Sequence, residues 1–502
     1  MRRVLIASVL ALAACTLDPE YERPALPTAP AYPSAGPAYA ADRTHLPAAV
    51  PQTPADLVGW RQVFTDPRLQ ALIALALENN RDLRIAILNI AAAQAQYRAQ
   101  WAQLFPVIDI TGNATIEGEP TSVAEPTGAP SSTPVASGTS APTASGAKHD
   151  TSRLYQAGIG TTSWEIDLFG QIRSQTRAQF ELYLAQIENR RSTQISLVAQ
   201  VANAYIVLIA DQEQLKIAQQ TQDAQSRSYA LTEAMFNHGS TTLLSLRQAE
   251  TTVDTARASV AQYTRQVAQD ENALTLLLGA PIPATLPPGR DLVHQEIIAD
   301  LPAGLPSALL ERRPDITAAE HTLLSANAEI GAARAAFFPS ITLTATGGLA
   351  SNYLNKLFTP AAYTWTFAPQ ITIPIFTWGE NLANLDYANV QKRIDIATYE
   401  KTIQTAFREV SDGLAARGTD LDQLAAQLRL VKAYTDAYNL AAMRFRGGLD
   451  SFLATLESQQ SLFTAEQTLI SLKAAQLQNL VTLYKALGGG WYADTANEGA
   501  PG

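Results

Sequence analysis

The chain contains a single cysteine, Cys15, among its 502 residues. One thiol cannot form a disulfide within the chain, and a thiolate metal site needs several cysteine or histidine ligands. Only 5 histidines are present, and they show no zinc-binding spacing with the cysteine. We therefore expect no internal disulfide, no metal site and no cofactor.

Positive charge is also scarce. The 36 lysines and arginines are outnumbered by 46 aspartates and glutamates, which gives a formal net charge of -10. A nucleic-acid partner is not expected, because phosphate binding needs basic patches.

Catalytic motifs are missing as well. The chain has no histidine-containing triad motif, phosphate loop or zinc spacing. The stretch "LLERRPDI" (residues 309–316) is better interpreted as a helix end followed by a helix that starts at the proline. "TATGGL" is glycine-rich but lies in an expected strand, so it is not a nucleotide fingerprint. We therefore expect a protein that is not an enzyme.

Long apolar runs are lacking after the N-terminus. We find no later stretch of about 18 apolar residues, so the sequence predicts no transmembrane helix. A chain of this kind can cross a membrane only as β-strands in a closed barrel.

The N-terminal residues 1–14 read as a signal peptide. Arg2 and Arg3 are followed by the apolar stretch Val4–Ala14, which is too short to span a bilayer. Leu12-Ala13-Ala14-Cys15 resembles the lipobox of bacterial lipoproteins, which implies lipidation of Cys15. Thr16 follows, rather than the aspartate that retains lipoproteins at the inner membrane, so the resemblance implies the outer membrane. An ordinary signal peptide with an incidental cysteine is the alternative.

The rest of the chain is a tandem duplication. Three landmarks recur 209 residues further along the chain: Phe169-Gly170 as Trp378-Gly379, Gly239 as Gly448, and Gly279 as Gly488. Pro106 and Pro339 end a similar motif at a spacing of 233 residues. The extra 24 residues of the first copy fall in the segment 118–149, which is rich in Pro, Ser, Thr, Ala and Gly. We expect this segment to be an external, disordered loop.

These landmarks give the domain organisation. A lipidated extended segment (15–65) precedes the first repeat (66–280), and a linker with an equatorial segment (281–304) leads to the second repeat (305–490) and a tail (491–502). Each repeat has a helix, two strands and a long helical hairpin. The strands are expected at about 107–117, 154–169, 340–350 and 364–376.

The strand segments alternate apolar and polar residues. This period fits either a membrane barrel with a wet lumen or a half-buried soluble sheet. Four strands cannot close a membrane barrel, because the smallest known barrels have about eight. A barrel therefore requires several chains to pool their strands, and three chains would supply twelve, which is within the usual range.

The helices that follow the strands are unusually long. Residues Gln171–Phe236 contain no proline or glycine, which allows a rod of roughly 100 Å. The matching segment Glu380–Arg446 contains no proline. Shorter helices are expected at Asp66–Leu104, Thr241–Leu278, Pro314–Phe338 and Ser451–Leu487. The fold class is thus mostly α with a membrane β-barrel, continued by a column of helices.

Glycines end both rods. In "NHGSTT", Gly239 can adopt the left-handed conformation that terminates a helix, and Ser240 or Thr241 can cap the next one. In "RGGLDS", Gly447 or Gly448 ends the helix, and Asp450 or Ser451 begins its partner. Each chain therefore has two hairpin tips.

Several stretches together resemble the outer-membrane factor family, the TolC-like proteins, and its lipoprotein branch that serves resistance-nodulation-division efflux pumps. They are the lipobox followed by "PEYERP", "LLERRPDI", "AAFFPSITLTATGG" (335–348) and "RFRGGLDSFLATLESQQSLFTAEQ" (444–467). The resemblance implies a homotrimer with a 12-stranded outer-membrane barrel and a periplasmic helical barrel closed at its far end. It also implies docking onto a periplasmic adaptor and an inner-membrane pump.

The resemblance assigns roles at the second tip. The family turns a leucine and, one helical turn later, an aspartate toward the pore axis, and Leu453 and Glu457 match them. Glutamate replaces aspartate here, which changes the reach of the carboxylate. Arg444, Phe445 and Arg446 occupy the positions of a cluster that locks the closed state, with Phe445 where a tyrosine is common.

The resemblance implies that the adaptor docks onto the two hairpin tips, whose residues are His238, Gly239 and Ser240, with Gly447, Gly448, Leu449 and Asp450. The expected function is a passive exit duct for drugs or other small toxic compounds, opened on adaptor docking. Two alternatives stay open: an exit duct for type I protein secretion, and a lipid-anchored periplasmic scaffold.

Overall fold

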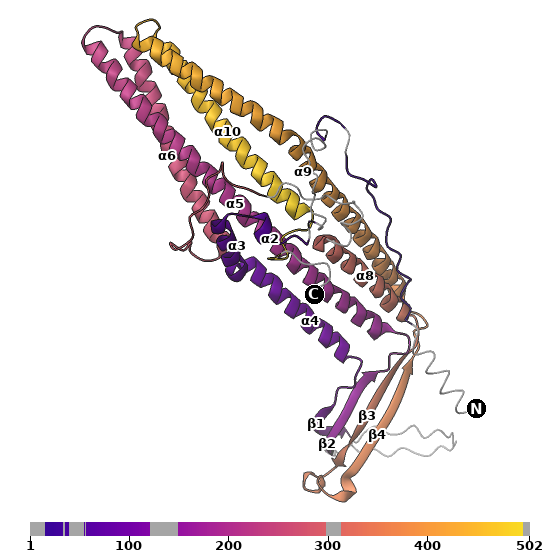
Figure 1. Cartoon of the computed structure of the whole chain (residues 1–502). Coiled ribbons are helices and arrows are strands. Elements are labelled where there is room, and N and C mark those ends of the chain that lie inside the picture. Colours follow the sequence, from indigo (N-terminus) through magenta and orange to yellow (C-terminus); the bar gives the residue numbers. More distant parts are fainter. Residues whose placement is uncertain are drawn as a thin grey trace, which may run out of the picture. The chain divides into compact units, whose positions relative to one another are not determined.

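The computed structural model describes residues 16–33, 36–39, 55, 57–120, 149–297 and 313–494. The elements of the first copy are α2 (Trp60–Val63), α3 (Pro67–Asn79), α4 (Arg81–Ala102), β1 (Asp109–Pro120), β2 (His149–Glu165), α5 (Gln171–Asn237) and α6 (Leu243–Leu278). Those of the second copy are α8 (Pro314–Ala335), β3 (Ser340–Ser351), the 3₁₀ turns η3 (Leu354–Lys356) and η4 (Pro360–Ala362), β4 (Tyr363–Thr372), α9 (Glu380–Arg446) and α10 (Phe452–Ala486). Both copies therefore run helix, strand pair, long helix and shorter helix (Figure 1).

The backbone repeats with the sequence. The three glycine pairs of the 209-residue spacing all have positive φ: 80° and 85° at Gly170 and Gly379, 73° and 70° at Gly239 and Gly448, and 67° and 86° at Gly279 and Gly488. This left-handed conformation is costly for residues with a Cβ atom. The long helices α5 and α9 each have 67 residues. The duplication is therefore confirmed at the level of backbone conformation.

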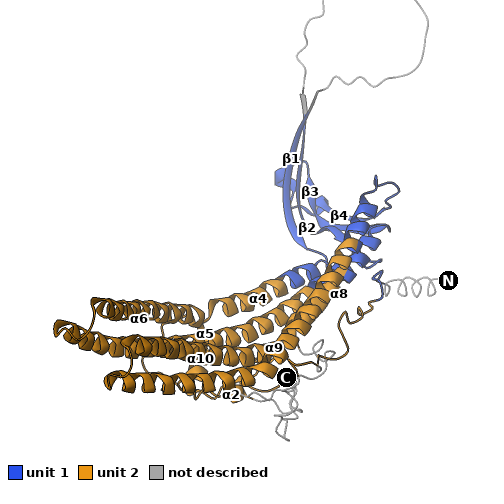
Figure 2. Ribbon diagram, turned by 90° about the horizontal axis from the view of Figure 1, so that it is seen from above, with its two compact units in different colours: residues 1–20, 96–179, 327–389 blue, residues 21–95, 180–326, 390–502 orange. Residues whose placement is uncertain are grey.

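The described chain divides into two compact units (Figure 2). One contains residues 1–20, 96–179 and 327–389, and the other contains residues 21–95, 180–326 and 390–502. The first unit holds the sheet, and the second holds most of the helical hairpins.

The sheet of the first unit is antiparallel, with the strand order β1-β2-β3-β4. A bulge interrupts the β2–β3 ladder between Thr161 and Trp164. Large apolar side chains of the edge strands are exposed, among them Ile110 at 84% and Trp365 at 68%. The sheet thus has apolar surface and two edge strands that pair on one side only within the described residues.

The strand bounds differ from the expected ones. β2 begins at His149 and ends at Glu165, because its ladder with β1 continues to the pair Pro120–His149. Residues 118–120 and 149 therefore belong to strands and not to the expected loop, and residues 121–148 lie outside the described residues. β4 ends at Thr372, two residues before Pro374, which has no N–H for a ladder hydrogen bond.

The expected helix over Asp66–Leu104 is wrong, since Asn80 divides it into α3 and α4. The Asn80 side chain accepts a hydrogen bond from the Leu83 N–H at 2.9 Å, which caps α4. It also donates to the Leu277 carbonyl of α6 at 2.8 Å. A contact distant in sequence therefore fixes the break.

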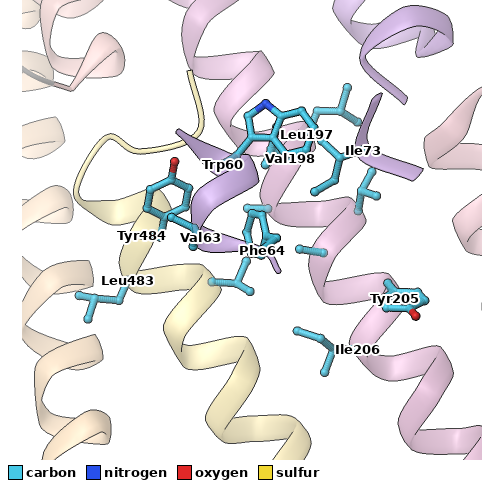
Figure 3. Packing of buried hydrophobic residues seen from close by; sticks show 14 of the residues in the cluster. Trp60, Val63, Phe64, Ile73, Leu197, Val198, Tyr205, Ile206, Leu483 and Tyr484 are labelled. Carbon is cyan, nitrogen blue, oxygen red and sulfur yellow. The ribbon is translucent and has the colours of Figure 1, made fainter. Parts of the chain in front are cut away.

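The core of the second unit lies where α2 meets α5 and α10 (Figure 3). Trp60 and Phe64 are almost completely buried, and the Phe64 ring meets that of Tyr484 edge-on at 6.0 Å. The Tyr484 hydroxyl donates to the Val58 carbonyl. These aromatics are among the largest fully buried side chains of a cluster that otherwise consists of aliphatic residues.

One stretch of α5 contradicts the expectation of no long apolar run. The helix contains an 18-residue window with a mean hydropathy of 1.5. Because 61% of that window is buried inside the protein, we assign it to the helical core.

Candidate gate and docking surface at the hairpin tips

Both hairpin tips close with the same backbone motif. In the first tip, the Gly239 N–H donates to the Phe236 carbonyl and the Ser240 N–H donates to the Met235 carbonyl, both at 2.8 Å. In the second, Gly448 donates to Phe445 and Leu449 to Arg444, both at 2.9 Å. These bonds satisfy the last carbonyls of α5 and α9 and require the left-handed glycine.

The cap of the first return helix differs from the expected one, whereas that of the second is one of the two expected residues. Thr242, rather than Ser240 or Thr241, caps α6 by accepting from the Ser245 N–H at 3.2 Å. Ser451 is the N-cap of α10 but makes no side-chain capping bond.

The Asp450 carboxylate does not cap α10 and instead forms an ion pair with Arg444. Arg444 donates to both of its carboxylate oxygens, at 2.6 and 3.0 Å. The hydrogen bonds from Arg444 lower the pKa of Asp450. This fork geometry favours the pair, although both side chains are partly open to solvent and the pair contributes little on its own.

The first turns of α10 have one buried face and one exposed face. Phe452 and Leu456 are buried with Ala249 of α6, and Tyr229 and Phe445 pack against them. This group, the tip cluster, joins the ends of the two hairpins, and the rings of Phe445 and Phe452 lie 5.3 Å apart.

Leu453, Glu457 and Gln460 lie on the opposite, exposed face of α10. Leu453 is 46% exposed, which is high for a leucine in a helix that packs on its other side. Within the described part of the chain, the Glu457 carboxylate has no ion-pair partner. The face therefore offers an apolar side chain and, one turn later, an unneutralised carboxylate.

The predicted site residues are thus distributed over three environments. Arg444 and Asp450 are paired, Phe445 lies in the tip cluster, and Arg446 is exposed. The expected docking residues His238, Gly239, Ser240, Gly447, Gly448 and Leu449 are all exposed. Cys15 lies outside the described residues.

Sequence reasoning missed the role of Arg313, the last arginine of "LLERRPDI". Its guanidinium is buried and donates to Asp315 at 2.6 and 3.0 Å, to Glu409 of α9 at 2.9 Å and to the Ala486 carbonyl at the end of α10 at 3.0 Å. The arginine therefore ties the start of α8 to both helices of the second hairpin. The motif contained the only signal, namely two arginines beside a helix-starting proline.

The N-terminal segment was predicted as extended, but its contacts with the helices were missed. Arg23 donates to both oxygens of Glu320 in α8, at 2.7 and 2.9 Å, and the Tyr21 hydroxyl donates to the same carboxylate at 3.2 Å. Further on, Ala38 lies so close to Gly418 of α9 that a Cβ atom at residue 418 would be only 2.0 Å from the Ala38 carbonyl oxygen. The extended N-terminal segment therefore packs against α8 and α9.

Residues 72–280 and 305–489 match the family described as "Outer membrane efflux protein". The chain belongs to this family. It is an outer-membrane channel component of efflux pumps and is not an enzyme. The two matched ranges correspond to the two repeats, as the duplication predicts.

Individual relatives agree with this assignment. The channel is 47% identical over 98% of its length to the toluene efflux pump outer membrane protein TtgC of Pseudomonas putida, of which 96% is covered. It is 38% identical to the cation efflux system protein CusC of Escherichia coli, over 96% of this chain and 97% of that protein. The crystal structure of the open state of the Neisseria gonorrhoeae MtrE outer membrane channel superposes with a TM-score of 0.82 at 36% identity, covering 96% of this chain and all of that one.

The expected family, fold class, channel function and absence of enzymatic activity are confirmed by these matches. The two alternatives, a type I secretion duct and a periplasmic scaffold, find no counterpart in these three proteins, two of which are named for efflux and the third as an outer membrane channel.

Proposed function

We propose that three copies of this channel assemble into one exit duct. The open four-stranded sheet carries the proposal, because the edge strands β1 and β4 need partners and a membrane barrel has no free edge. Pairing β1 of one copy with β4 of the next closes a barrel of twelve strands, within the range of known membrane barrels. The exposed apolar side chains of these strands would then face lipid.

The duct would be passive and part of a tripartite pump. The exposed tips His238–Ser240 and Gly447–Asp450 would dock onto a periplasmic adaptor that connects the channel to an inner-membrane resistance-nodulation-division pump. The relatives above are named for toluene and for cations, which are chemically unlike. We infer that the duct carries small toxic compounds with little selection of its own and that the inner-membrane pump chooses them.

Electrophoresis in mild detergent tests the assembly. We expect the purified protein to migrate as a trimer when unheated and as a monomer after boiling, because a closed barrel unfolds only on heating. The tip variant Glu457→Gln is the matched control and should give the same two bands. A monomer in every unheated sample would contradict the barrel and leave the sheet without partners for its edges.

A lipid on Cys15 is proposed as an additional anchor. Cys15→Ser should abolish labelling by radioactive palmitate, since no other cysteine is present. The variant should stay in the outer-membrane fraction, because the barrel alone would hold it there. Labelling at the wild-type level would rule out this attachment site.

A further inference from the structure

A pair of carboxylates lies inside the first helical hairpin. Asp270 of α6 is only 9% exposed, and its Oδ1 accepts from the Gln266 side chain at 3.2 Å. Its Oδ2 has no hydrogen-bond partner among the described residues. Asp211 of α5 faces Asp270 across the hairpin, in which α5 and α6 are also joined by a hydrogen bond from the Thr252 hydroxyl to the Gln225 side chain at 3.0 Å. Two ionised carboxylates are both acceptors, so this contact is satisfied only when a proton lies between them.

The second copy of the repeat contains a different pair at the same place. Asp420 of α9 and Asn479 of α10 lie 209 residues beyond Asp211 and Asp270. The Asn479 side chain hydrogen-bonds the Asp420 carboxylate, and it also donates to the Gly413 carbonyl at 3.1 Å. An amide supplies two donor hydrogens, so this contact is satisfied without a shared proton. Burial still raises the pKa of Asp420, but the hydrogen bond from Asn479 acts against that rise.

The groups around Asp211 and Asp270 do not neutralise them. Among the described residues, no lysine or arginine forms an ion pair with either carboxylate, and Lys216 of α5 instead pairs with Glu213 at 3.4 Å. The titratable group facing Asp211 from α6 is Tyr263.

The neighbouring helices add no cation to the pair. From α10, Gln467 donates to the Tyr263 hydroxyl at 2.9 Å, and the flanking charged residues of that helix are Glu466 and Lys473, the latter bound to Gln476 at 3.1 Å. α3, which also packs against α6, carries Arg68 and Glu78 as its charged side chains, and neither forms an ion pair with the two aspartates.

We propose that Asp211 and Asp270 form a proton-binding site that takes up one proton between α5 and α6 and so stabilises the first hairpin more strongly than the second in mild acid. The proton joins one carboxylate oxygen and is donated to the other. When the proton leaves, two negative charges face each other in a partly buried site and weaken the packing of the two helices.

The pH window follows from the direction of the shift. Burial, together with the hydrogen bond and charge of Asp270, raises the pKa of Asp211 to about 6. The folded hairpin therefore keeps a proton that the opened hairpin loses near its ordinary pKa of 3.8. The added stability is fully present at the acid end and is lost as the pH rises through about 6.

Hydrogen exchange of the full-length channel in detergent tests this site. After correction for intrinsic exchange rates, we expect the amides of α5 and α6 near these residues to be about tenfold more protected at pH 5 than at pH 7.5, since one pKa unit corresponds to a factor of ten. Asp270→Asn, which copies the second repeat, should remove this pH dependence, and Asp211→Asn should do the same. Asn479→Asp should strengthen the pH dependence in α9 and α10, because it removes the amide that lowers the pKa of Asp420.

Two results would overturn the proposal. One is pH-dependent protection of α5 and α6 that persists unchanged in both Asp→Asn variants. The other is equal protection at pH 7.5 on addition of Mg²⁺ or Ca²⁺ alone, which would assign the two carboxylates to a metal ion instead of a proton.

Discussion

At the scale of single residues, the turn of the second hairpin tip brings together two side chains, Arg444 and Asp450, whose pairing helical spacing does not predict. The i, i+4 spacing was sufficient to place Leu453 and Glu457 on one face of α10, and both are exposed there. The partner of Arg444 could not be predicted in the same way. The left-handed Gly448 turns the chain back so that Asp450 reaches Arg444, and this geometry depends on the turn rather than on helical spacing.

Glu457 provides the prediction at this scale. In the proposed trimer, three such carboxylates would converge at the closed end, and their repulsion would reach several kcal/mol at close range. A ring of this kind attracts cations. Glu457→Gln should therefore lower the cation selectivity of the closed pore several-fold in planar bilayers, with little change in trimer stability.

Gln460→Ala, on the same exposed face of α10, is a suitable control and should leave selectivity unchanged. If Glu457→Gln conducts with wild-type selectivity, this carboxylate does not line the constriction and its proposed role must be withdrawn.

At the scale of elements, the long helices were predictable and their neighbours less so. The absence of proline and glycine between Gln171 and Phe236 specifies α5 almost completely, because nothing in that stretch interrupts a helix. Asn80, in contrast, breaks the preceding helix through a hydrogen bond to Leu277, which lies 197 residues away. The length of β2 likewise depends on its ladder with β1 and not on its own alternation.

At the scale of the whole molecule, duplication explains what is shared and where the copies differ. The left-handed glycines at three equivalent places give both copies the same turns. The copies then diverge in their polar interior, with Asp211–Asp270 in one and Asp420–Asn479 in the other. The Arg444–Asp450 pair belongs to the second tip, and the tip cluster joins that tip to the first hairpin. We propose that together they hold the closed state.

Single-channel conductance of the purified channel in planar bilayers tests the central claim, a trimeric duct held closed at its tips, most directly. Leu453→Ala removes apolar bulk from the proposed constriction, and Arg444→Ala breaks the ion pair with Asp450. We predict a low conductance for the wild type, a higher one for Leu453→Ala and the highest for the double variant, while His238→Ala at the first tip stays at the wild-type level. A double variant that conducts no better than the wild type would contradict a gate at the second hairpin tip.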